Sequence, residues 1–167
     1  FMKELGFIPE LFAYPYGETS KEVISILKEF NISHAFGQHS GVISIYDNKY
    51  YLPRFSLNEQ FGDLDRFIFA AKSLPLIIKD FIPSEMYLTD NLKPRIEFSI
   101  ESDVDINQLN CFANAGGNWS SQTITNITEK RVQIILNNNF KSGRGRINCT
   151  VQKNKNWHWF GYQFLIR

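Results

Sequence analysis

Residues 96–100, Ile96-Glu97-Phe98-Ser99-Ile100, alternate apolar and polar side chains with a period of two. Successive side chains of a β-strand point to opposite faces, so this stretch predicts a strand with one buried face. The same alternation returns in residues 109–111, 132–136 and 147–151, and the segments between these runs are rich in Gly, Asn and Ser. Short alternating strands joined by such segments predict an antiparallel β-sandwich in the second half of the chain.

The last apolar run, residues 157–166, is apolar on both faces, which predicts a central strand or a strand at an interface. Trp119, Trp157 and Trp159 offer flat rings that can stack on sugars, although burial in the core is the simpler interpretation. Gly143-Arg144-Gly145-Arg146 can meet an anionic or sugar surface, and its simpler interpretation is a solvated hairpin.

Composition limits the classes of function. The chain has 167 residues, 43% of them hydrophobic, and a net charge of +1. That length suits one domain or two small ones, and so low a charge argues against a nucleic-acid partner. No apolar run approaches the roughly 20 residues needed to cross a bilayer, so we expect no membrane span. The sequence opens at Phe1 in the middle of a pattern, which suggests a piece of a longer protein.

The first part of the chain mixes strand and helix patterns. A strand is predicted over residues 10–14, and a helix follows it with Thr19 and Glu22 at capping-box spacing. Its buried stripe is predicted to be Val23, Ile26, Leu27 and Phe30. Further expectations are short strands at 35–37 and 42–46, a helix over 63–74 with Leu64, Phe67, Ile68 and Ala71 on one face, and a Pro-rich linker at 75–94.

These patterns predict an α/β part over residues 1–83 and a β-sandwich over residues 84–167. Strands that alternate with helices are typical of a parallel sheet or barrel. Two such units cannot close a sheet alone, so partner strands are expected to come from elsewhere.

Two local features have the character of a site. Pro15-Tyr16-Gly17 ends a predicted strand, where backbone N–H groups can stabilise an oxyanion, although an ordinary turn has the same pattern. His39 follows the next predicted strand, where it can act as a general acid or serve as a hydrogen-bonded structural residue.

The sequence says less about a metal site and about the state of the two cysteines. The sequence has no His-x-x-x-His, no Cys-x-x-Cys and no cluster of Asp and His, so we predict no metal ligands in this chain. Cys111 and Cys149 form a disulfide if the protein is exported, or else they are two buried thiols. The sequence leaves both alternatives open.

Taken in order, several segments resemble one family. Residues 12–18, 36–41, 52–55 and 63–74 resemble the C-terminal half of the catalytic domain of bacterial polysaccharide deacetylases. Residues 109–111, 143–150 and 157–161 resemble the β-sandwich that one branch of the family carries after that domain. The resemblance implies the C-terminal portion of a distorted (β/α) barrel followed by an antiparallel β-sandwich.

The resemblance also implies an activity, which is metal-dependent N-deacetylation of N-acetylated sugars in a polysaccharide or glycoconjugate. The metal, commonly Zn²⁺, and the catalytic base belong to the N-terminal half of the family's domain, so the implied partner is an N-terminal fragment of the same protein. The implied location is periplasmic or secreted, and the implied substrate is an N-acetylated glycan, whose identity stays open.

Residue roles follow from matching positions. Tyr16 takes the family's oxyanion-hole position, with Pro15 and Gly17 beside it at the substrate. His39 takes the acid role by position, since the family's Leu-x-x-His motif is absent, and Arg54 can reach the site. The family often has an Arg where this chain has Ala13, a departure that puts activity in doubt. The alternatives are a non-catalytic carbohydrate-binding or assembly module and a degenerate relative of the deacetylases.

Overall fold

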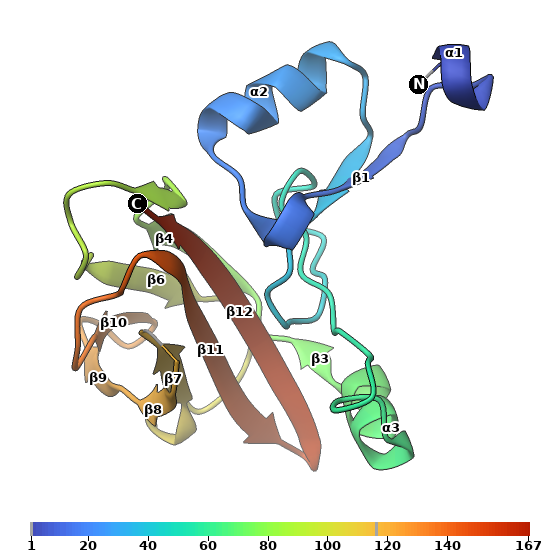
Figure 1. The fold of residues 1–167 in the computed structure, drawn as a ribbon. Coiled ribbons are helices and arrows are strands. Elements are labelled where there is room, and N and C mark those ends of the chain that lie inside the picture. The colour runs from blue at the N-terminus through green and yellow to red at the C-terminus, as the bar shows by residue number, and fades with distance from the viewer. Residues whose placement is uncertain (1, 116) are drawn as a thin grey trace.

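The fold is described from a computed structural model, which describes residues 2–115 and 117–167. This part of the chain is mostly β-strand with a few short helices (Figure 1). Two layers of sheet form the larger, C-terminal portion, and a smaller α/β portion lies against one of them.

The larger portion is sandwich-like, as its alternating pattern predicts. One sheet has the strand order β4-β6-β10-β9, and the other has the order β3-β12-β11-β7-β8, with β5 beside β12. The first sheet comprises β4 (Ile78–Ile82), β6 (Ile96–Ile100), β9 (Thr123–Asn126) and β10 (Arg131–Ile135). The second comprises β3 (Leu74–Pro75), β5 (Tyr87–Leu88), β7 (Asn110–Asn114), β8 (Trp119–Ser121), β11 (Gly143–Lys153) and β12 (Asn156–Ile166).

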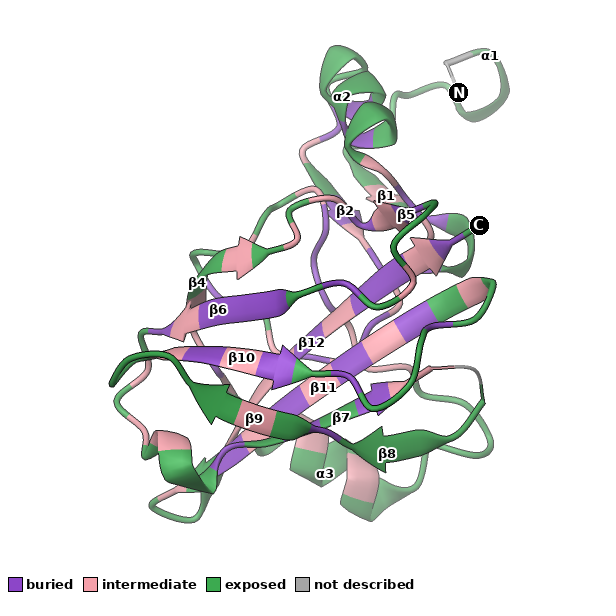
Figure 2. Cartoon of the chain, turned by 90° about the vertical axis from the view of Figure 1, so that its left-hand side faces the viewer, coloured by how far each residue is buried: buried purple, intermediate pink, exposed green. Residues whose placement is uncertain are grey.

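One hydrophobic cluster lies between the two sheets. The alternating side chains supply it: Phe98 and Ile100 from β6, Ile147 and Val151 from β11, and Phe164 from β12 are all buried. Figure 2 shows the same alternation as stripes of buried and half-buried positions along β11 and β12. A sheet whose strands alternate in this way buries one face and leaves the other for contacts outside the core.

A disulfide joins two neighbouring strands inside this core. Cys111 of β7 and Cys149 of β11 are opposite each other in the antiparallel register, and both are fully buried. Of the two alternatives that the sequence leaves open, the disulfide is the one found.

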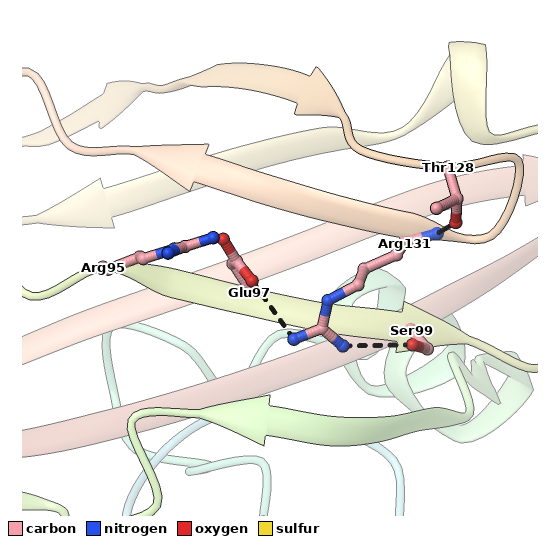
Figure 3. Close-up of polar contacts among 5 residues, drawn as sticks. All are labelled: Arg95, Glu97, Ser99, Thr128 and Arg131. Atoms are coloured by element: carbon pink, nitrogen blue, oxygen red, sulfur yellow. Dashed lines mark hydrogen bonds and ion pairs between the residues drawn. The ribbon is translucent and has the colours of Figure 1, made fainter.

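The first sheet also holds an ion-pair network (Figure 3). Glu97 of β6 is buried and pairs with Arg95 and with Arg131 of β10, whose Nη2 lies 3.1 Å from the carboxylate. Arg131 also donates to the Ser99 hydroxyl. A buried carboxylate requires such partners, because desolvation without them is costly.

The smaller portion is a β-α-β unit with a second helix after it. Strands β1 (Leu11–Ala13) and β2 (His34–Phe36) pair in parallel, and Leu52 bridges β2 on its other side. The remaining elements are α1 (Met2–Leu5), a 3-10 turn η1 (Pro15–Gly17), α2 (Lys21–Glu29), α3 (Leu64–Lys72) and a 3-10 turn η2 (Ile106–Gln108) in the sandwich. The alternation of strand and helix agrees with the sequence.

The helices differ in detail from the prediction. The N-cap of α2 is Ser20, whose hydroxyl accepts from the Val23 amide, so the predicted capping box at Thr19 is wrong. Of the predicted buried stripe, Leu27 is buried as expected and packs beside buried Ile24, but the prediction is wrong for Val23, Ile26 and Phe30, which are exposed. The side that carries these three residues has no covering element in the described part of the chain.

Helix α3 also leaves its large apolar side chains exposed. Asp63 caps it through the Arg66 amide, and it ends before Pro75 as expected. None of its residues is buried, and its predicted inner face, which includes Leu64 and Phe67, is exposed.

Two connecting segments also differ. The strand predicted at residues 42–46 is not found, and residues 44–47 instead form a turn in which the Ser44 amide donates to the Asp47 carboxylate. Residues 75–94 are not a free linker, since β4 pairs with β6, and β3 and β5 pair with β12. The division into domains at residues 83 and 84 stays a prediction, and strand pairing assigns residues 74–82 to the sandwich sheets.

No barrel closes among residues 2–115 and 117–167. The described helices include none that is both long enough and apolar enough to cross a membrane.

Candidate functional site

The outer face of the second sheet carries a groove of about 690 Å³. The period of two that sends Ile147 and Val151 into the core sends Arg146, Asn148 and Thr150 to the opposite face. In the β11–β12 register, Arg146 lies opposite Gln163, and Thr150 lies opposite Trp159. One face of two long strands therefore presents guanidinium, amide, hydroxyl and aromatic groups side by side.

The α/β portion forms the opposite wall of the groove. Gln38 and Ser40 come from the loop after β2, Ser56 and Asn58 from the following segment, and Phe69 from α3. Phe69 lies 5.8 Å from the Trp159 ring and 6.1 Å from the Trp157 ring, centroid to centroid. The groove thus lies between the two portions of the chain.

The three tryptophans line this groove and are not core residues, which corrects the simpler interpretation of the sequence. Trp119 is 45% exposed, and Trp157 and Trp159 are half-buried beside Phe69. Trp157 and Trp159 are two residues apart on β12 and therefore share its outer face, whereas Phe160 packs against the core cluster. An aromatic floor with neighbouring polar groups is a common form of ligand site.

Residues 143–146 are not a solvated hairpin turn, because they begin the long strand β11. Arg144 and Arg146 therefore point to one face of the sheet, and Gly145 between them points to the other, packed on Phe140. Both arginines line the groove.

The turn Pro15–Gly17 lies next to one end of the groove. Tyr16 is 69% exposed, and the centroid of its ring lies 5.8 Å from the Arg144 guanidinium carbon. The turn follows β1 directly, as the sequence predicts. Tyr16 has a φ of 56° and Gly17 a φ of 71°, so two successive residues hold a left-handed backbone that is costly for tyrosine.

Contacts from the neighbouring segments hold this turn in place. A Cβ at Gly17 would lie 2.4 Å from the Gln38 amide nitrogen, so glycine is required by space as well as by φ. The Gln163 Nε2 donates to the carbonyls of Tyr16 and Gly17, at 3.2 and 3.0 Å. The turn is therefore fixed to β12.

Gln163 and Gln38 are site residues that our reading of the sequence missed. Buried Gln163 also accepts from the Arg146 Nε at 2.8 Å, and the Gln38 Oε1 accepts from the Arg144 Nη1 at 3.0 Å. Each glutamine joins the α/β portion to an arginine of β11. A signal for Gln163 exists in the sequence, since it is a lone amide inside an apolar strand, where a buried polar group needs specific partners.

His39 does not line the groove. It lies in a second cavity of about 380 Å³ and is 3% exposed, with its ring 4.6 Å from that of Tyr51. Its Nδ1 has no hydrogen-bond partner among the described residues. Burial, reinforced by the positive charges of Arg146 and Arg54, lowers the pKa of His39 to about 3, so the imidazole is neutral at pH 7.

Arg54 lies beside His39. Its Nε donates to the Gly37 carbonyl at 2.8 Å, and its amide donates to the His39 carbonyl at 3.0 Å. The structure therefore places Arg54 next to His39. It places Tyr16 next to Arg144, which lines the groove.

The described side chains contain no candidate metal site. Among residues 2–115 and 117–167, no group of three His, Cys, Asp or Glu side chains lies close enough to hold a metal ion. The described residues alone therefore do not supply a site for the Zn²⁺ that the resemblance implies.

Comparison with known proteins gives no family. No family model matches the sequence, and no curated protein matches it. Among solved structures, the chain is similar to two structures of PcoC, a copper resistance protein from Escherichia coli, both with a TM-score of 0.40. Sequence identity is 11% and 13%, and the likeness covers 55% and 54% of this chain and 99% and 96% of the PcoC chains.

Proposed function

We propose that this chain binds an N-acetylated polysaccharide in the groove and forms the C-terminal portion of a metal-dependent N-deacetylase. The observation that carries the proposal is the groove itself, which runs between the aromatic outer face of the sandwich and the loop after β2, with the Pro15–Gly17 turn at one end. Sugar rings present a C–H face that stacks on aromatic rings and hydroxyls that need polar partners. Trp157 and Trp159 supply the first, and Asn148 supplies a polar group beside them.

The proposed partner is an N-terminal fragment of the same protein that completes the barrel. Parallel sheets are usually covered on both faces, and a two-stranded sheet is marginal alone. Here β1 and β2 form such a sheet, and Val23, Ile26 and Phe30 expose an apolar stripe on the helix between them. Additional strands and helices would bury this surface.

In the proposed enzyme, Tyr16 contributes its backbone N–H to the oxyanion hole, and Pro15 and Gly17 shape the turn against the substrate. Gln163 supports this role by holding the turn through two carbonyls. The metal and the base would come from the N-terminal fragment, because the described side chains offer no ligand cluster.

His39 needs a changed environment to act as a general acid. A neutral imidazole with a pKa near 3 has no proton to give at pH 7. Carboxylates brought in by the N-terminal fragment would raise this pKa, since a nearby negative charge favours the protonated form. Arg54 would then position the His39 segment through its two backbone hydrogen bonds.

A periplasmic or secreted location is part of the proposal. Its support is the Cys111–Cys149 disulfide, because disulfides persist in oxidising compartments and are rare in the cytosol.

The second candidate is a non-catalytic carbohydrate-binding or assembly module, or a degenerate relative of the deacetylases. Two observations favour it: His39 is neutral and hidden from the groove, and the family's Arg position holds Ala13. Glycan binding without deacetylation is the outcome that this candidate predicts.

Binding is tested first on this chain, by calorimetry with a hexamer of N-acetylglucosamine. Trp157→Ala should weaken binding about tenfold or more, because it removes a stacking ring. Phe30→Ala is the matched control, since Phe30 is an exposed aromatic residue on α2 outside the groove. Equal affinity in all three proteins would contradict binding in the groove.

Catalysis is tested on the protein that includes the N-terminal fragment, by following acetate release from the same hexamer with added Zn²⁺. Release that is lost in a Gly17→Ala variant, whose added methyl group collides with Gln38, supports the deacetylase. Binding with no release of acetate selects the second candidate.

A further inference from the structure

The described residues that line the groove include three arginines and no Asp, Glu or Lys. Arg66 comes from α3 on one wall, and Arg144 and Arg146 come from β11 on the other. The positive charge is therefore local to the groove, although the net charge of the whole chain is only +1. A groove lined by one sign of charge favours ligands of the opposite sign.

None of the three arginines forms an ion pair within the described part of the chain. Arg66 lies over the Phe61 ring at 4.8 Å, Arg144 donates to Gln38, and Arg146 donates to Gln163. Asp63, the N-cap of α3, accepts from the Arg66 backbone amide, but neither Asp63 nor Asp65 forms an ion pair with the Arg66 guanidinium and neither lines the groove. A guanidinium has five N–H donors, so most donors of these side chains have no partner among the residues that the structure describes.

Another partly buried arginine of this chain does have an acidic partner. Arg131, which is also partly buried, pairs with the carboxylate of Glu97 and with Ser99. A partly buried arginine of the sandwich is thus neutralised by a carboxylate of the same sheet. Arg146 is half-buried without a carboxylate, and burial together with neighbouring Arg144 lowers its pKa. An anion bound between Arg144 and Arg146 would relieve both effects.

We propose that the groove selects an acidic polysaccharide, in which N-acetylated sugars are interspersed with sugars that carry a carboxylate or sulfate group. The inference rests on the proposed function and names its substrate class. Trp157 and Trp159 stack on the sugar rings, while the guanidinium groups of Arg66, Arg144 and Arg146 bind the anionic groups. Planar guanidinium donors match the two oxygens of a carboxylate or sulfate.

The test compares two ligands that differ only in charge. The acidic probe is an oligosaccharide of alternating N-acetylglucosamine and glucuronate, and the neutral probe is the same oligosaccharide with its carboxylates reduced to alcohols. Calorimetry on this chain at low salt should give at least about tenfold tighter binding of the acidic probe. The advantage should shrink as salt is raised, because screening weakens charge interactions. A sulfated counterpart of the acidic probe then distinguishes carboxylate from sulfate by its affinity.

Three variants locate the effect. Arg66→Gln, Arg144→Gln and Arg146→Gln should each weaken binding of the acidic probe about fivefold and change binding of the neutral probe less than twofold. Lys93→Gln is the charge-matched control, since Lys93 is exposed in a loop away from the groove. Arg66→Gln keeps the test least dependent on folding, because no residue of α3 is buried and the Arg66 guanidinium lies over the Phe61 ring without an ion pair to any described residue.

The outcomes separate this inference from the proposed function. Equal affinity for the two probes, or an equal loss in Lys93→Gln, would overturn the acidic preference while glycan binding stands. If neither these probes nor the N-acetylglucosamine hexamer binds, the proposed function and this inference both fail.

Discussion

Gly161 shows how one missing side chain joins the two portions of the molecule. A Cβ at this position would lie 1.8 Å from the Ser40 carbonyl oxygen and 2.9 Å from the Asn148 Oδ1. The loop after β2 therefore touches the backbone of β12 directly, and it does so opposite Asn148 in the groove face. The geometry of the groove depends on this close contact.

We predict that Gly161→Ala lowers the free energy of unfolding by about 1–3 kcal/mol, because the added methyl group meets backbone that cannot rotate away. Urea unfolding followed by tryptophan fluorescence measures the change. Glycan affinity should fall in the same variant, since the loop that carries Gln38 and Ser40 must shift. A variant with unchanged stability and affinity would show that the loop does not pack on Gly161.

His39 makes stability depend on pH. The unfolded chain binds a proton near pH 6.5, whereas the folded chain binds it only near pH 3, so the unfolded state holds more protons between these values. The free energy of unfolding should therefore fall as the pH is lowered from about 6.5, by up to about 1.4 kcal/mol per pH unit. Above pH 7 this group contributes no slope.

Urea unfolding of the parent chain and His39→Gln between pH 4 and 8 checks this prediction. His39→Gln should flatten the slope below pH 6.5, and His34→Gln, at an exposed histidine, should keep the parent's slope. An identical slope in parent and His39→Gln would mean that His39 is accessible to protons when folded.

At the scale of elements, the sandwich strands were the most predictable part of the fold. Their alternation with a period of two is a local pattern, and it corresponds to the alternating burial of β10 and β11. On α2, Val23, Ile26 and Phe30 were predicted to be buried and are exposed. Their spacing shows that they share one side of the helix, but it does not show which element, if any, covers that side. That information belongs to residues distant in sequence, or outside this chain.

Only the part of the site that has a local sequence pattern could be predicted. The Pro15–Gly17 turn has a local sequence pattern, and the structure has it directly after β1. The groove depends on the register of β11 against β12 and on the packing of α3, and neither can be derived from one sequence. The simpler interpretations of the sequence, a core position for Trp157 and a hairpin turn for Arg144, are therefore wrong, because both residues line the groove.

The link between β7 and β11 gives the element-scale prediction. The Cys111–Cys149 disulfide closes a loop with a sequence separation of 38, so its loss should cost about 2–4 kcal/mol, mostly through the unfolded state. The double variant Cys111→Ala with Cys149→Ala should therefore unfold at lower urea concentration than the parent.

Reductant provides the control for this prediction. Both cysteines are fully buried, so reductant without urea should leave the disulfide of the parent intact. Reductant in urea should move the parent's midpoint toward that of the double variant. A midpoint that is the same with and without the disulfide would contradict the prediction.

At the scale of the whole molecule, the two portions differ in how completely they are packed. The sandwich has a closed core, and its longest strands, β11 and β12, pair along their whole length. The α/β portion has a smaller cluster around Tyr14, Ala35 and Tyr51, and α2 is largely exposed (Figure 2), including its apolar residues Val23, Ile26 and Phe30. One contact between them is the Tyr51 hydroxyl, which donates to the Gln163 carbonyl at 2.7 Å.

This difference predicts unequal local stability. Amides of α2 should exchange with solvent deuterium faster than amides of β11 and β12, because few buried contacts oppose local opening of the helix. Addition of the N-terminal fragment should slow exchange in α2 and leave β11 unchanged, since the new contacts would cover Val23, Ile26 and Phe30. Hydrogen–deuterium exchange with mass spectrometry resolves both segments in one experiment. Protection of α2 equal to that of β11 in the isolated chain would mean that the exposed stripe needs no partner, and the case for a completing fragment would then fail.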